Sequence, residues 1–524
     1  MRPTIENYLK KLEESSAASL LLNNTLAGIE KENLRVTDAA YLAQTPHPQV
    51  LGAALTHPFI TTDYSESLLE MITPPIDNRK ALLTWMEKLH TYVYPHLGEE
   101  LLWSPSMPCV IPSQDDVPIA QYGTSHQGRF RTLYRIGLGH RYEKKMQTIA
   151  GIHFNYSFPL SFWEIWNDLY GKGQGLQATI NENYFALLRN FLRHGWIIDY
   201  LFGASSAVDA SFLSEHNRPA GLLPYKQNSL YAPYACSLRM SDLGYHNSTQ
   251  KKLNISFNSV KEYAQTLKNA VNTPYPPYQA IFEKYGQDSQ INANLLQIEA
   301  EYYAAIRPKH TASKSQAQSQ ALLQFGVEYL EVRAIDINPY LPLGINSEQI
   351  YFMEVFLLYC LLKDSPEFTA KDYSLISKNT QTVVFEGRKP GCLLQDLNTD
   401  QPILLSVWAG DIFSDLNQIA AFLDRHTEDK RYMQALNYFK ERIKHPELLP
   451  SAIMLDDLLS KYNSFEDLGL TLSIKNKDYF KHKKLSALEI AEFDQIVRES
   501  LQEKRILEEQ QTGSFEEFLA QYFN

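Results

Sequence analysis

The sequence has few cysteines and no concentrated basic segment. Its 524 residues include four cysteines, and no two of them are spaced as a CxxC pair. This spacing argues against zinc ribbons and thioredoxin-type redox sites, and cysteines this sparse are typical of free thiols in a reducing compartment. The net charge is −11, which argues against a protein that binds nucleic acid by neutralising phosphates.

Long apolar segments are also missing. The longest apolar stretch, residues 350–362, is interrupted by Glu354 and is too short to span a bilayer, so we expect a buried helix there. The first 15 residues are charged and lack the apolar segment of a signal peptide. We therefore expect a cytoplasmic protein with no membrane partner and no nucleic-acid partner.

The sequence lacks the glycine-rich loops that usually hold phosphate. It contains neither GxGxxG nor GxxxxGK[ST], so a nucleotide would be bound without a Walker loop. Apolar residues make up 44% and charged residues 21% of the chain, a composition typical of globular proteins.

Predicted strands alternate with long helical segments, without a regular βαβ rhythm. The expected strands are residues 26–36, 68–75, 148–158, 327–339 and 382–391. The expected helices are the first 25 residues, 79–96 and 161–202. This order favours an α+β fold with a mostly antiparallel sheet. After about residue 410 the sequence becomes helical and charge-rich, so we divide the chain into residues 1–410, the main body, and residues 411–524, a helical region packed on the same unit.

Two acidic residues share a strand face with apolar residues in GIEKENLRV, residues 28–36. Strand alternation places Glu30 and Glu32 on the same side as Leu34 and Val36. Buried carboxylates are costly unless positive charge compensates them. The alternative is a solvated strand face on which neighbouring basic residues pair with the acids.

A second group of acids follows in TTDYSESLLEMITPP. Asp63, Glu66 and Glu70 are spaced by three and four residues, which is one face of a helix if this segment is helical. If it is a strand, Glu70 shares a face with Leu68 and Ile72. Both alternatives place an acid among apolar residues, and both stay open.

Two more predicted strands carry polar residues on one side. His153 and Asn155 share a face, and Glu331 and Arg333 share a face with Ile335. Several acids with one histidine and one asparagine on inward faces suggest hard divalent cations such as Mg²⁺. The alternatives are a core histidine and a cross-strand ion pair.

Basic and aromatic residues supply candidate contacts for substrates. Basic side chains in turns bounded by proline or glycine suit phosphate, which predicts contacts from Arg307, Lys309, Arg388 and Lys389. A mixture of tyrosine and arginine suits a zwitterionic amino acid, which points to Tyr134, Arg135, Arg239 and Tyr245. The alternatives are exposed charged turns for the first set, and an aromatic core with surface arginines for the second.

Ten motifs in the same order resemble the proteobacterial type of glutamate–cysteine ligase, also called γ-glutamylcysteine synthetase. They run from about residue 20 to about residue 395 and include GIEKENLRV, ALTHPFITTDYSESLLEMITP, AQYGTSHQGRFRTLYRIGL, QTIAGIHFNYSFP, YACSLRMSDLGY, VEYLEVRAIDINP and EGRKPG. Each motif is weak alone, and their common order makes the resemblance specific.

The resemblance implies a fold and a reaction. The fold is like that of glutamine synthetase, with a curved, mostly antiparallel sheet, helices on its outer face and a concave face that binds metals, ATP and glutamate. ATP phosphorylates the γ-carboxylate of L-glutamate, and the amine of L-cysteine attacks the acyl phosphate, in the first step of glutathione biosynthesis. The implied cofactors are two or more Mg²⁺ or Mn²⁺ ions, with glutathione as a feedback inhibitor. We expect a monomer.

The resemblance also implies roles for individual residues. The implied metal ligands are Glu30, Glu32, Asp63, Glu70, His153 and Glu331. Arg333, Glu30 and Glu331 are implied in catalysis. Substrate contacts are implied for Tyr134, Arg135, Arg239, Tyr245, Tyr303 and Asn155. Contacts with ATP or phosphate are implied for Arg307, Arg388 and Lys389.

Other functions use similar residues and stay open. The same acyl-phosphate chemistry serves a ligase with a different amine acceptor. A two-metal phosphohydrolase also needs carboxylates, histidine and arginine, and it would release phosphate from ATP without an amino acid. The third alternative is a non-catalytic amino-acid or nucleotide binder.

Overall fold

The fold is built around a seven-stranded antiparallel sheet with the strand order β2-β3-β1-β5-β10-β9, in which β4 also pairs with β1. The computed structural model describes residues 4–15, 20–21, 24–213, 219, 221–243, 253–311, 316–427 and 430–523. The strands are β1 (Leu26–Val36), β2 (Ile60–Thr62), β3 (Leu68–Ile72), β4 (Leu101–Leu102), β5 (Ile152–Ser157), β9 (Ile306–Lys309) and β10 (Tyr329–Ile335). The predicted α+β class with a mainly antiparallel sheet is confirmed.

Helices enclose this sheet. Those before residue 330 are α1 (Ile5–Glu14), α3 (Arg79–Val93), α4 (His126–Tyr142), α5 (Leu160–Tyr170), α6 (Leu176–His194), α7 (Trp196–Phe202), α8 (Val260–Asn272), α9 (Pro276–Tyr285) and α10 (Gln318–Phe325). Those after it are α11 (Ser347–Leu362), α12 (Ala370–Glu386), α13 (Leu405–Asp424), α14 (Arg431–Lys444), α15 (Pro450–Lys461), α16 (Phe465–Lys481), α17 (Ala487–Glu509) and α18 (Phe515–Phe523). None of the described helices combines the length and the apolar character that crossing a lipid bilayer requires.

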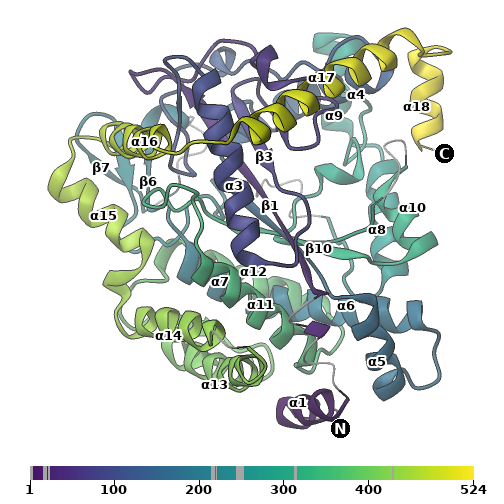
Figure 1. The fold of residues 1–524 in the computed structure, drawn as a ribbon, viewed down its shortest axis with the longest axis vertical. Helices are drawn as coiled ribbons and strands as arrows, with labels where there is room; N and C mark the ends of the chain where they lie inside the picture. Colours follow the sequence, from purple (N-terminus) through teal and green to yellow (C-terminus); the bar gives the residue numbers. More distant parts are fainter. Residues whose placement is uncertain are drawn as a thin grey trace.

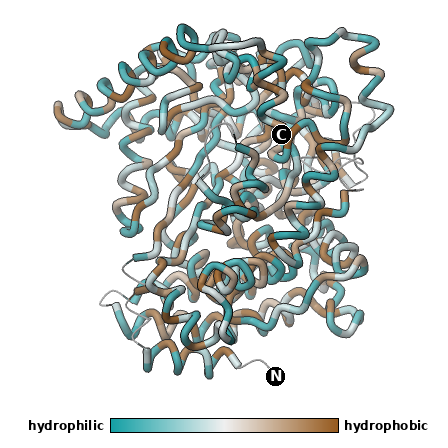
Figure 2. The backbone as a smooth tube through the Cα atoms, turned by 90° about the vertical axis from the view of Figure 1, so that its right-hand side faces the viewer, coloured by the Kyte–Doolittle hydropathy of each residue, from teal (hydrophilic) through white to brown (hydrophobic). Residues whose placement is uncertain are grey.

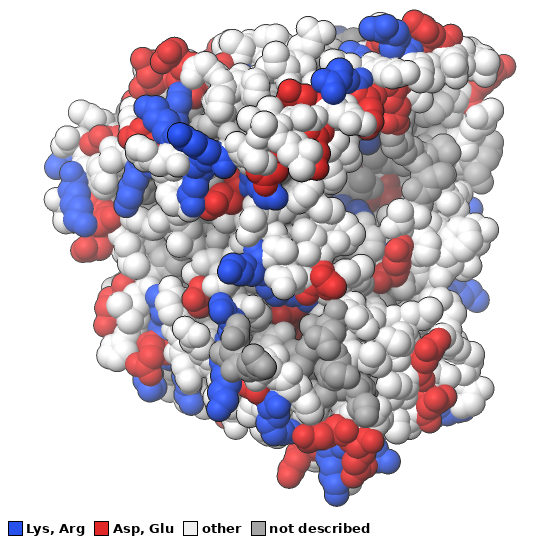
Figure 3. Space-filling view, in the orientation of Figure 1, with Lys and Arg blue, Asp and Glu red and all other residues white. Residues whose placement is uncertain are grey.

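Two small sheets lie outside the central one. The first contains β6 (Ala207–Asp209), β7 (Leu223–Tyr225) and β8 (Ser229–Tyr231), and the second pairs β11 (Leu393–Gln395) with β12 (Pro402–Leu404). Hydrophobic and hydrophilic residues alternate along the helices (Figure 2), as expected where one side of each helix packs on a core. Acidic and basic side chains are interspersed on the face drawn in Figure 3.

Helix α3 covers one face of the central sheet near β1 and β3 (Figure 1). Lys31 of β1 points to this side, because its Nζ lies 2.9 Å from Nε2 of His90 on α3. Side chains alternate along a strand. Glu30 and Glu32 therefore point to the opposite face, which is free to carry the candidate site.

Most predicted elements near the site are confirmed, and two are wrong. The segment 382–391 was expected as a strand, but residues up to Glu386 form the end of α12. This helix begins with a capping box in which Thr369 and Asp372 satisfy each other's backbone N–H groups, a strong local start signal. The expected turn at 306–310 is instead the edge strand β9, where Pro308 is tolerated because a sheet edge needs fewer backbone donors.

The predicted buried helix at 350–362 is confirmed as part of α11. Its single acid, Glu354, is 3% exposed and accepts a hydrogen bond of 2.6 Å from Nε of Arg79. Tyr432 of α14 donates to the other oxygen of the same carboxylate at 3.2 Å. The buried charge is thus paired, as its desolvation requires.

The C-terminal helices extend the same hydrophobic core and hold α4. Apolar residues of α13, α14 and α16 belong to that core, and residue 410 lies inside α13, so the division into 1–410 and 411–524 stays a prediction. Helix α17 crosses the molecule and leads to α18 beside α4 (Figure 1). The backbone N–H groups of Thr124 and His126 donate to the side chains of Glu508 and Gln511, each at 2.9 Å. The last turn of α17 and the residues just after it therefore bind the start of α4.

Candidate active site

Strand pairing brings most of the predicted acids to one face of the sheet. The register pairs Glu32 with Glu70, Glu30 with His153, Asn155 with Glu331, and Glu331 with Arg307. Residues that lie directly opposite each other in a sheet point to the same side. Five strands, β1, β3, β5, β9 and β10, therefore contribute to a single polar surface.

The tightest group consists of Glu30, His153 and Glu331. Their candidate ligand atoms all lie within 4.8 Å of one another. Nδ1 of His153 is 3.0 Å from Oε2 of Glu30 and 3.9 Å from Oε1 of Glu331. Asn155 donates from Nδ2 to Oε1 of Glu30 at 2.7 Å, so the amide orients the acid. One oxygen of each acid, together with the imidazole, can face a cation.

Glu32 and Glu70 form a second acidic group next to the first. Oε2 of Glu32 accepts a hydrogen bond of 2.7 Å from the backbone N–H of Gly151, and Oε1 lies 3.8 Å from Nε2 of His153. Asp63 is in the turn between β2 and β3, and its side chain is 45% exposed. One histidine thus connects the two acidic groups.

The helical alternative for residues 63–70 is wrong, because Glu70 lies on β3. Glu66 does not join the acids of the sheet face. Its carboxylate accepts hydrogen bonds from the backbone N–H groups of His47 and Gln121, at 2.6 and 2.5 Å. This residue fixes two loops.

The acids differ in how their charge is compensated. Burial, with added repulsion from Glu30, Asp63 and Glu32, raises the pKa of Glu70 well above its ordinary value. Burial also raises the pKa of Glu32. For Glu30 burial acts in the same direction and is the largest single effect, but the hydrogen bond with His153 and the charges of His153 and Lys309 together leave the pKa lowered. The Glu32–Glu70 side is therefore short of positive charge.

Basic residues lie along the other side of the group. Nη1 of Arg333 is 3.2 Å from Oε1 of Glu331, and Nζ of Lys309 is 3.8 Å from Oε2. Burial opposes ionisation of Glu331 and is the largest single effect, but Lys309 and Arg333, together with His153 and Arg307, hold its pKa well below the ordinary value. Arg307 donates to the backbone carbonyls of Ala300 and Tyr302. Positive charge is thus concentrated at β9 and β10.

A β-bulge in β10 corrects one predicted face. The pairing of β10 with β5 shifts between Val332 and Ile335, so that Ile335 lies opposite Ile152. Ile152 and His153 are neighbours on one strand and point to opposite faces. Ile335 therefore does not share a face with Glu331, as alternation had predicted, because the extra bulge residue reverses the order. The contacts of Arg333 with Glu331 keep its guanidinium at the site.

Helix α4 brings Tyr134 and Arg135 toward the acids. Ser125 caps the start of this helix by accepting from the N–H of Gly128. Nη2 of Arg135 lies 3.9 Å from Oδ1 of Asp63, and its guanidinium carbon lies 4.6 Å from the centre of the Tyr122 ring. Burial is the main reason that the pKa of Tyr134 is raised, so its hydroxyl stays neutral.

Arg239 is not a surface residue, as one alternative had it, but is fully buried. Nη1 lies 3.7 Å from Oδ1 of Asp336, and Nη2 donates to the backbone carbonyl of Arg333 at 2.8 Å. A Cβ added at Gly151 would lie 2.1 Å from Nη2, so glycine is required for the guanidinium to fit. Arg239 supports the backbone that presents Arg333. Tyr245 lies outside the described residues.

Sequence reasoning missed Asp336 and Gly151. Asp336 accepts hydrogen bonds from the backbone N–H of Ala204 and from the hydroxyls of Ser205 and Ser237, at 2.8, 2.6 and 2.9 Å. In the sequence, the only indication of a role for Asp336 is that it directly follows the strand that carries Glu331. A polar residue there indicates a buried network, but its partners are distant in sequence.

The other predicted residues have these surroundings. Tyr303 is 8% exposed, and its hydroxyl donates to Sδ of Met240 at 3.1 Å. Arg388 donates to the backbone carbonyls of residues 233 and 235, each at 3.1 Å. Lys389 pairs with Glu386 at 3.1 Å, with half of its side chain exposed. Arg388 and Lys389 follow α12 and do not lie on the sheet face that carries the acids.

The chain is similar to known proteins over nearly its whole length. A sequence model of the glutamate–cysteine ligase family matches residues 9–383. The glutamate–cysteine ligase of Alcanivorax borkumensis is 44% identical over 526 residues, covering 99% of both proteins. That of Azotobacter vinelandii is 45% identical over 506 residues, covering 96% of this chain and 95% of that protein.

Solved structures give the same result. The crystal structure of glutamate–cysteine ligase from Francisella tularensis in complex with AMP matches with a TM-score of 0.89 and 32% identity, covering 95% of this chain and 97% of that one. A bifunctional glutathione synthetase from Pasteurella multocida matches with a TM-score of 0.72 and 24% identity, covering 93% of this chain and 57% of that one. The second likeness concerns the fold alone.

Proposed function

Because the chain belongs to the glutamate–cysteine ligase family, we propose how its own residues carry out that reaction. The enzyme forms γ-glutamylcysteine from L-glutamate and L-cysteine with ATP, as the ADP-forming first step of glutathione biosynthesis. One observation carries the proposal for the site. Glu30, His153 and Glu331 converge on one face of the sheet, with Arg333 beside them.

The acidic residues fit divalent metal ions. Nε2 of His153 and Oε2 of Glu331 are buried and have no hydrogen-bond partner among the described residues, and such atoms suit a cation. Carboxylates with one imidazole suit Mg²⁺ or Mn²⁺. We propose two or more ions, the first held by Glu30, His153 and Glu331. The second would be held by Glu32, Glu70 and Asp63.

When bound, the metal offsets negative charge between the γ-phosphate of ATP and the γ-carboxylate of glutamate. Arg333 and Lys309 would bind the transferring phosphoryl group, because both cations lie within 4 Å of Glu331 and at the edge of the acidic surface. Their fixed positions stabilise charge that develops in the transition state. Arg307, on the same face of β9, adds positive charge for ATP. Asn155 keeps Glu30 oriented toward the metal.

The amine acceptor would lie between α4 and the sheet. Arg135 is placed to bind the carboxylate of cysteine, because its guanidinium is held beside Asp63 and the Tyr122 ring. Tyr134 and Tyr303 supply neutral hydroxyls and aromatic surface. Arg239 acts indirectly, through the backbone of Arg333. For Tyr245, Arg388 and Lys389, direct contacts with substrates stay predictions.

Three properties of the whole enzyme complete the proposal. Glutathione contains both γ-glutamyl and cysteinyl groups, so it can occupy the two amino-acid pockets and inhibit by feedback. We propose that the enzyme works as a monomer in the cytoplasm. The bacterial relatives and the buried, unpaired cysteines support that location.

The decisive experiment measures ADP release from ATP and Mg²⁺ with glutamate alone, with cysteine alone and with both. We expect fast release only when both amino acids are present. Release with neither would identify a phosphohydrolase. Release with glutamate and an amine other than cysteine, at equal efficiency, would identify a ligase with another acceptor.

A further inference from the structure

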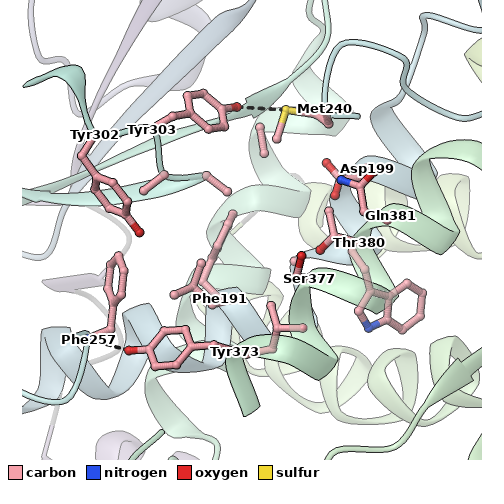
Figure 4. Close-up of a pocket in the computed structure, with 17 residues that line it drawn as sticks. Phe191, Asp199, Met240, Phe257, Tyr302, Tyr303, Tyr373, Ser377, Thr380 and Gln381 are labelled. Carbon is pink, nitrogen blue, oxygen red and sulfur yellow. Dashed lines mark hydrogen bonds between the residues drawn. The ribbon is translucent and has the colours of Figure 1, made fainter. Parts of the chain in front are cut away.

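A second cavity lies apart from the acidic surface, between α6, α7, α12 and the ends of β9 and β10 (Figure 4). Its volume is 160 Å³, and Ala304 and Ala334 line it where the two strands end. Six of the 17 residues that line it are aromatic. The rings are those of Phe191, Trp196, Phe257, Tyr302, Tyr303 and Tyr373.

The cavity contains one buried acid without an obvious purpose. Asp199 of α7 is 4% exposed, and its Oδ1 has no hydrogen-bond partner among the described residues. Figure 4 shows Asp199 at the end of the cavity opposite Phe257 and Tyr373. A buried carboxyl oxygen without a hydrogen-bond partner is unfavourable unless a ligand supplies one. The mechanism proposed above does not use this residue.

The surroundings of Asp199 favour a cation over an anion. Asp336 lies close enough to add negative potential. Arg239 is the nearby positive group, but it already faces Asp336 and the carbonyl of Arg333. Aromatic faces also attract cations through their quadrupole. The acidic groups and the aromatic rings therefore both favour a cationic ligand.

We propose that this cavity binds a small organic ammonium ion, whose N–H groups donate to Asp199 and whose apolar body contacts the aromatic wall. The volume of the cavity agrees with a ligand of this kind, because an apolar cavity of about 150 Å³ is large enough for benzene. A single-ring or branched aliphatic amine therefore fits. Burial raises the pKa of the Asp199 carboxyl well above its ordinary value, and an ammonium ion would favour the ionised form by pairing with it. A carboxylate ligand would gain no such pairing with Asp199.

The cavity shares residues with the candidate acceptor pocket. Tyr303 and Met240 both line it, and the Tyr303 hydroxyl donates to Met240 Sδ at 3.1 Å. Nη1 of Arg239 is 3.2 Å from the same sulfur, and Arg239 holds the backbone of Arg333. A bound ammonium ion would therefore change the apparent KM for cysteine. This coupling rests on the proposed function, whereas binding in the cavity does not.

Binding is tested by titration calorimetry on the full chain, with benzylamine as the ammonium probe and benzyl alcohol and benzoate as matched controls. We expect benzylamine to bind more tightly than either control. Asp199→Asn keeps the shape of the side chain and should weaken benzylamine about 10- to 100-fold, while leaving benzyl alcohol unchanged. Equal benzylamine affinity in both proteins would overturn the proposal.

A second pair of variants tests the location. Thr380→Phe places a ring in the cavity, whereas Ser374→Phe adds the same ring on α12 at a residue that does not line it. We expect only Thr380→Phe to abolish benzylamine binding. Loss in both variants, or in neither, would overturn the assignment to this cavity.

Steady-state kinetics test the coupling. Saturating benzylamine should change the KM for cysteine several-fold and leave the KM for glutamate nearly unchanged, and Asp199→Asn should remove this effect. Tight, Asp199-dependent binding without any change in the cysteine KM would overturn the coupling alone. If the enzyme failed to ligate glutamate to cysteine, the proposed function would fall, while calorimetry would still decide on the cavity.

Discussion

His153 of β5 and Glu30 of β1 lie directly opposite each other, with Nδ1 and Oε2 3.0 Å apart. A proton on Nδ1 satisfies this contact and leaves the lone pair of Nε2 available. Nε2 points toward Glu32, 3.8 Å away, and has no hydrogen-bond partner among the described residues. A histidine that donates one N–H to a carboxylate and keeps its other nitrogen free is typical of metal sites.

Glu30→Gln should lower kcat by more than about 100-fold while leaving the fold intact. Glutamine removes the negative charge and can accept only one of the hydrogen bonds that now come from His153 and Asn155. Loss of groups that orient a metal ligand costs about 10- to 100-fold, and loss of a ligand costs more. Turnover of ATP with both amino acids measures the effect. Glu441→Gln, in an exposed ion pair on α14, is the matched control. Normal activity of Glu30→Gln would refute its role.

Glu70→Gln should stabilise the metal-free protein increasingly as the pH rises. The pKa of Glu70 is raised in the folded state, so its contribution to stability is complete below the ordinary value of 4.5 and is lost as the pH rises through the raised value. Glutamine cannot ionise and avoids this loss. We expect the stability gap between the two proteins to widen as the pH rises from about 5 to about 8. Thermal melts in EDTA measure it.

The same variant should need more metal for activity, because it lacks one candidate ligand. A Glu70→Gln protein that is no more stable than the wild type at high pH would show that burial and the neighbouring acids do not raise the pKa of Glu70. The melting experiment measures how much Glu70 destabilises the metal-free protein, and the metal requirement measures how much it contributes to activity. Both are needed because functional sites often reduce stability.

Arg239→Ala should lower the free energy of unfolding by about 3–5 kcal/mol, the usual effect of removing one partner of a buried ion pair. The substitution leaves Asp336 without its nearby cation and removes the support of the Arg333 backbone. Urea denaturation measures the change. Arg425→Ala removes an exposed ion pair with Glu13 and should cost less than about 1 kcal/mol. Equal effects of the two variants would place Arg239 outside the network described here.

Removal of divalent metal by a chelator should stop turnover reversibly and lower the melting temperature. A ligand that binds only the folded state stabilises it by about 2.7 kcal/mol at 100 times its Kd. Adding Mg²⁺ or Mn²⁺ back should restore both activity and stability, and the concentration needed compares the two ions. Turnover that continues in excess EDTA would rule out a metal-dependent mechanism.

Strand periodicity predicted the sheet face that carries Glu30, Glu32, His153 and Glu331, because alternation is a local property that register then preserves. It failed at Ile335, where one extra bulge residue reversed the order. It also failed for α12, whose β-branched end resembles a strand, although a capping box more than ten residues earlier had already set the helix.

Features that depend on distant contacts could not be predicted. Arg239 resembled a substrate-binding arginine, and only the packing of Gly151 and Asp336 around it reveals a buried support. Asp199 is similar. Its helix is predictable, but the cavity it lines is formed by segments up to residue 381. Burial of a polar group is decided by tertiary neighbours rather than by local pattern.

The contacts at the start of α4 have a consequence for biosynthesis. Residues 124 and 126 are held by side chains 384 and 385 positions later in the chain. At about 5–20 residues per second, a ribosome needs roughly 20–80 s to make the stretch between them. The start of α4, which precedes Tyr134 and Arg135, therefore gains these two contacts only near the end of translation, once Glu508 and Gln511 have left the ribosome.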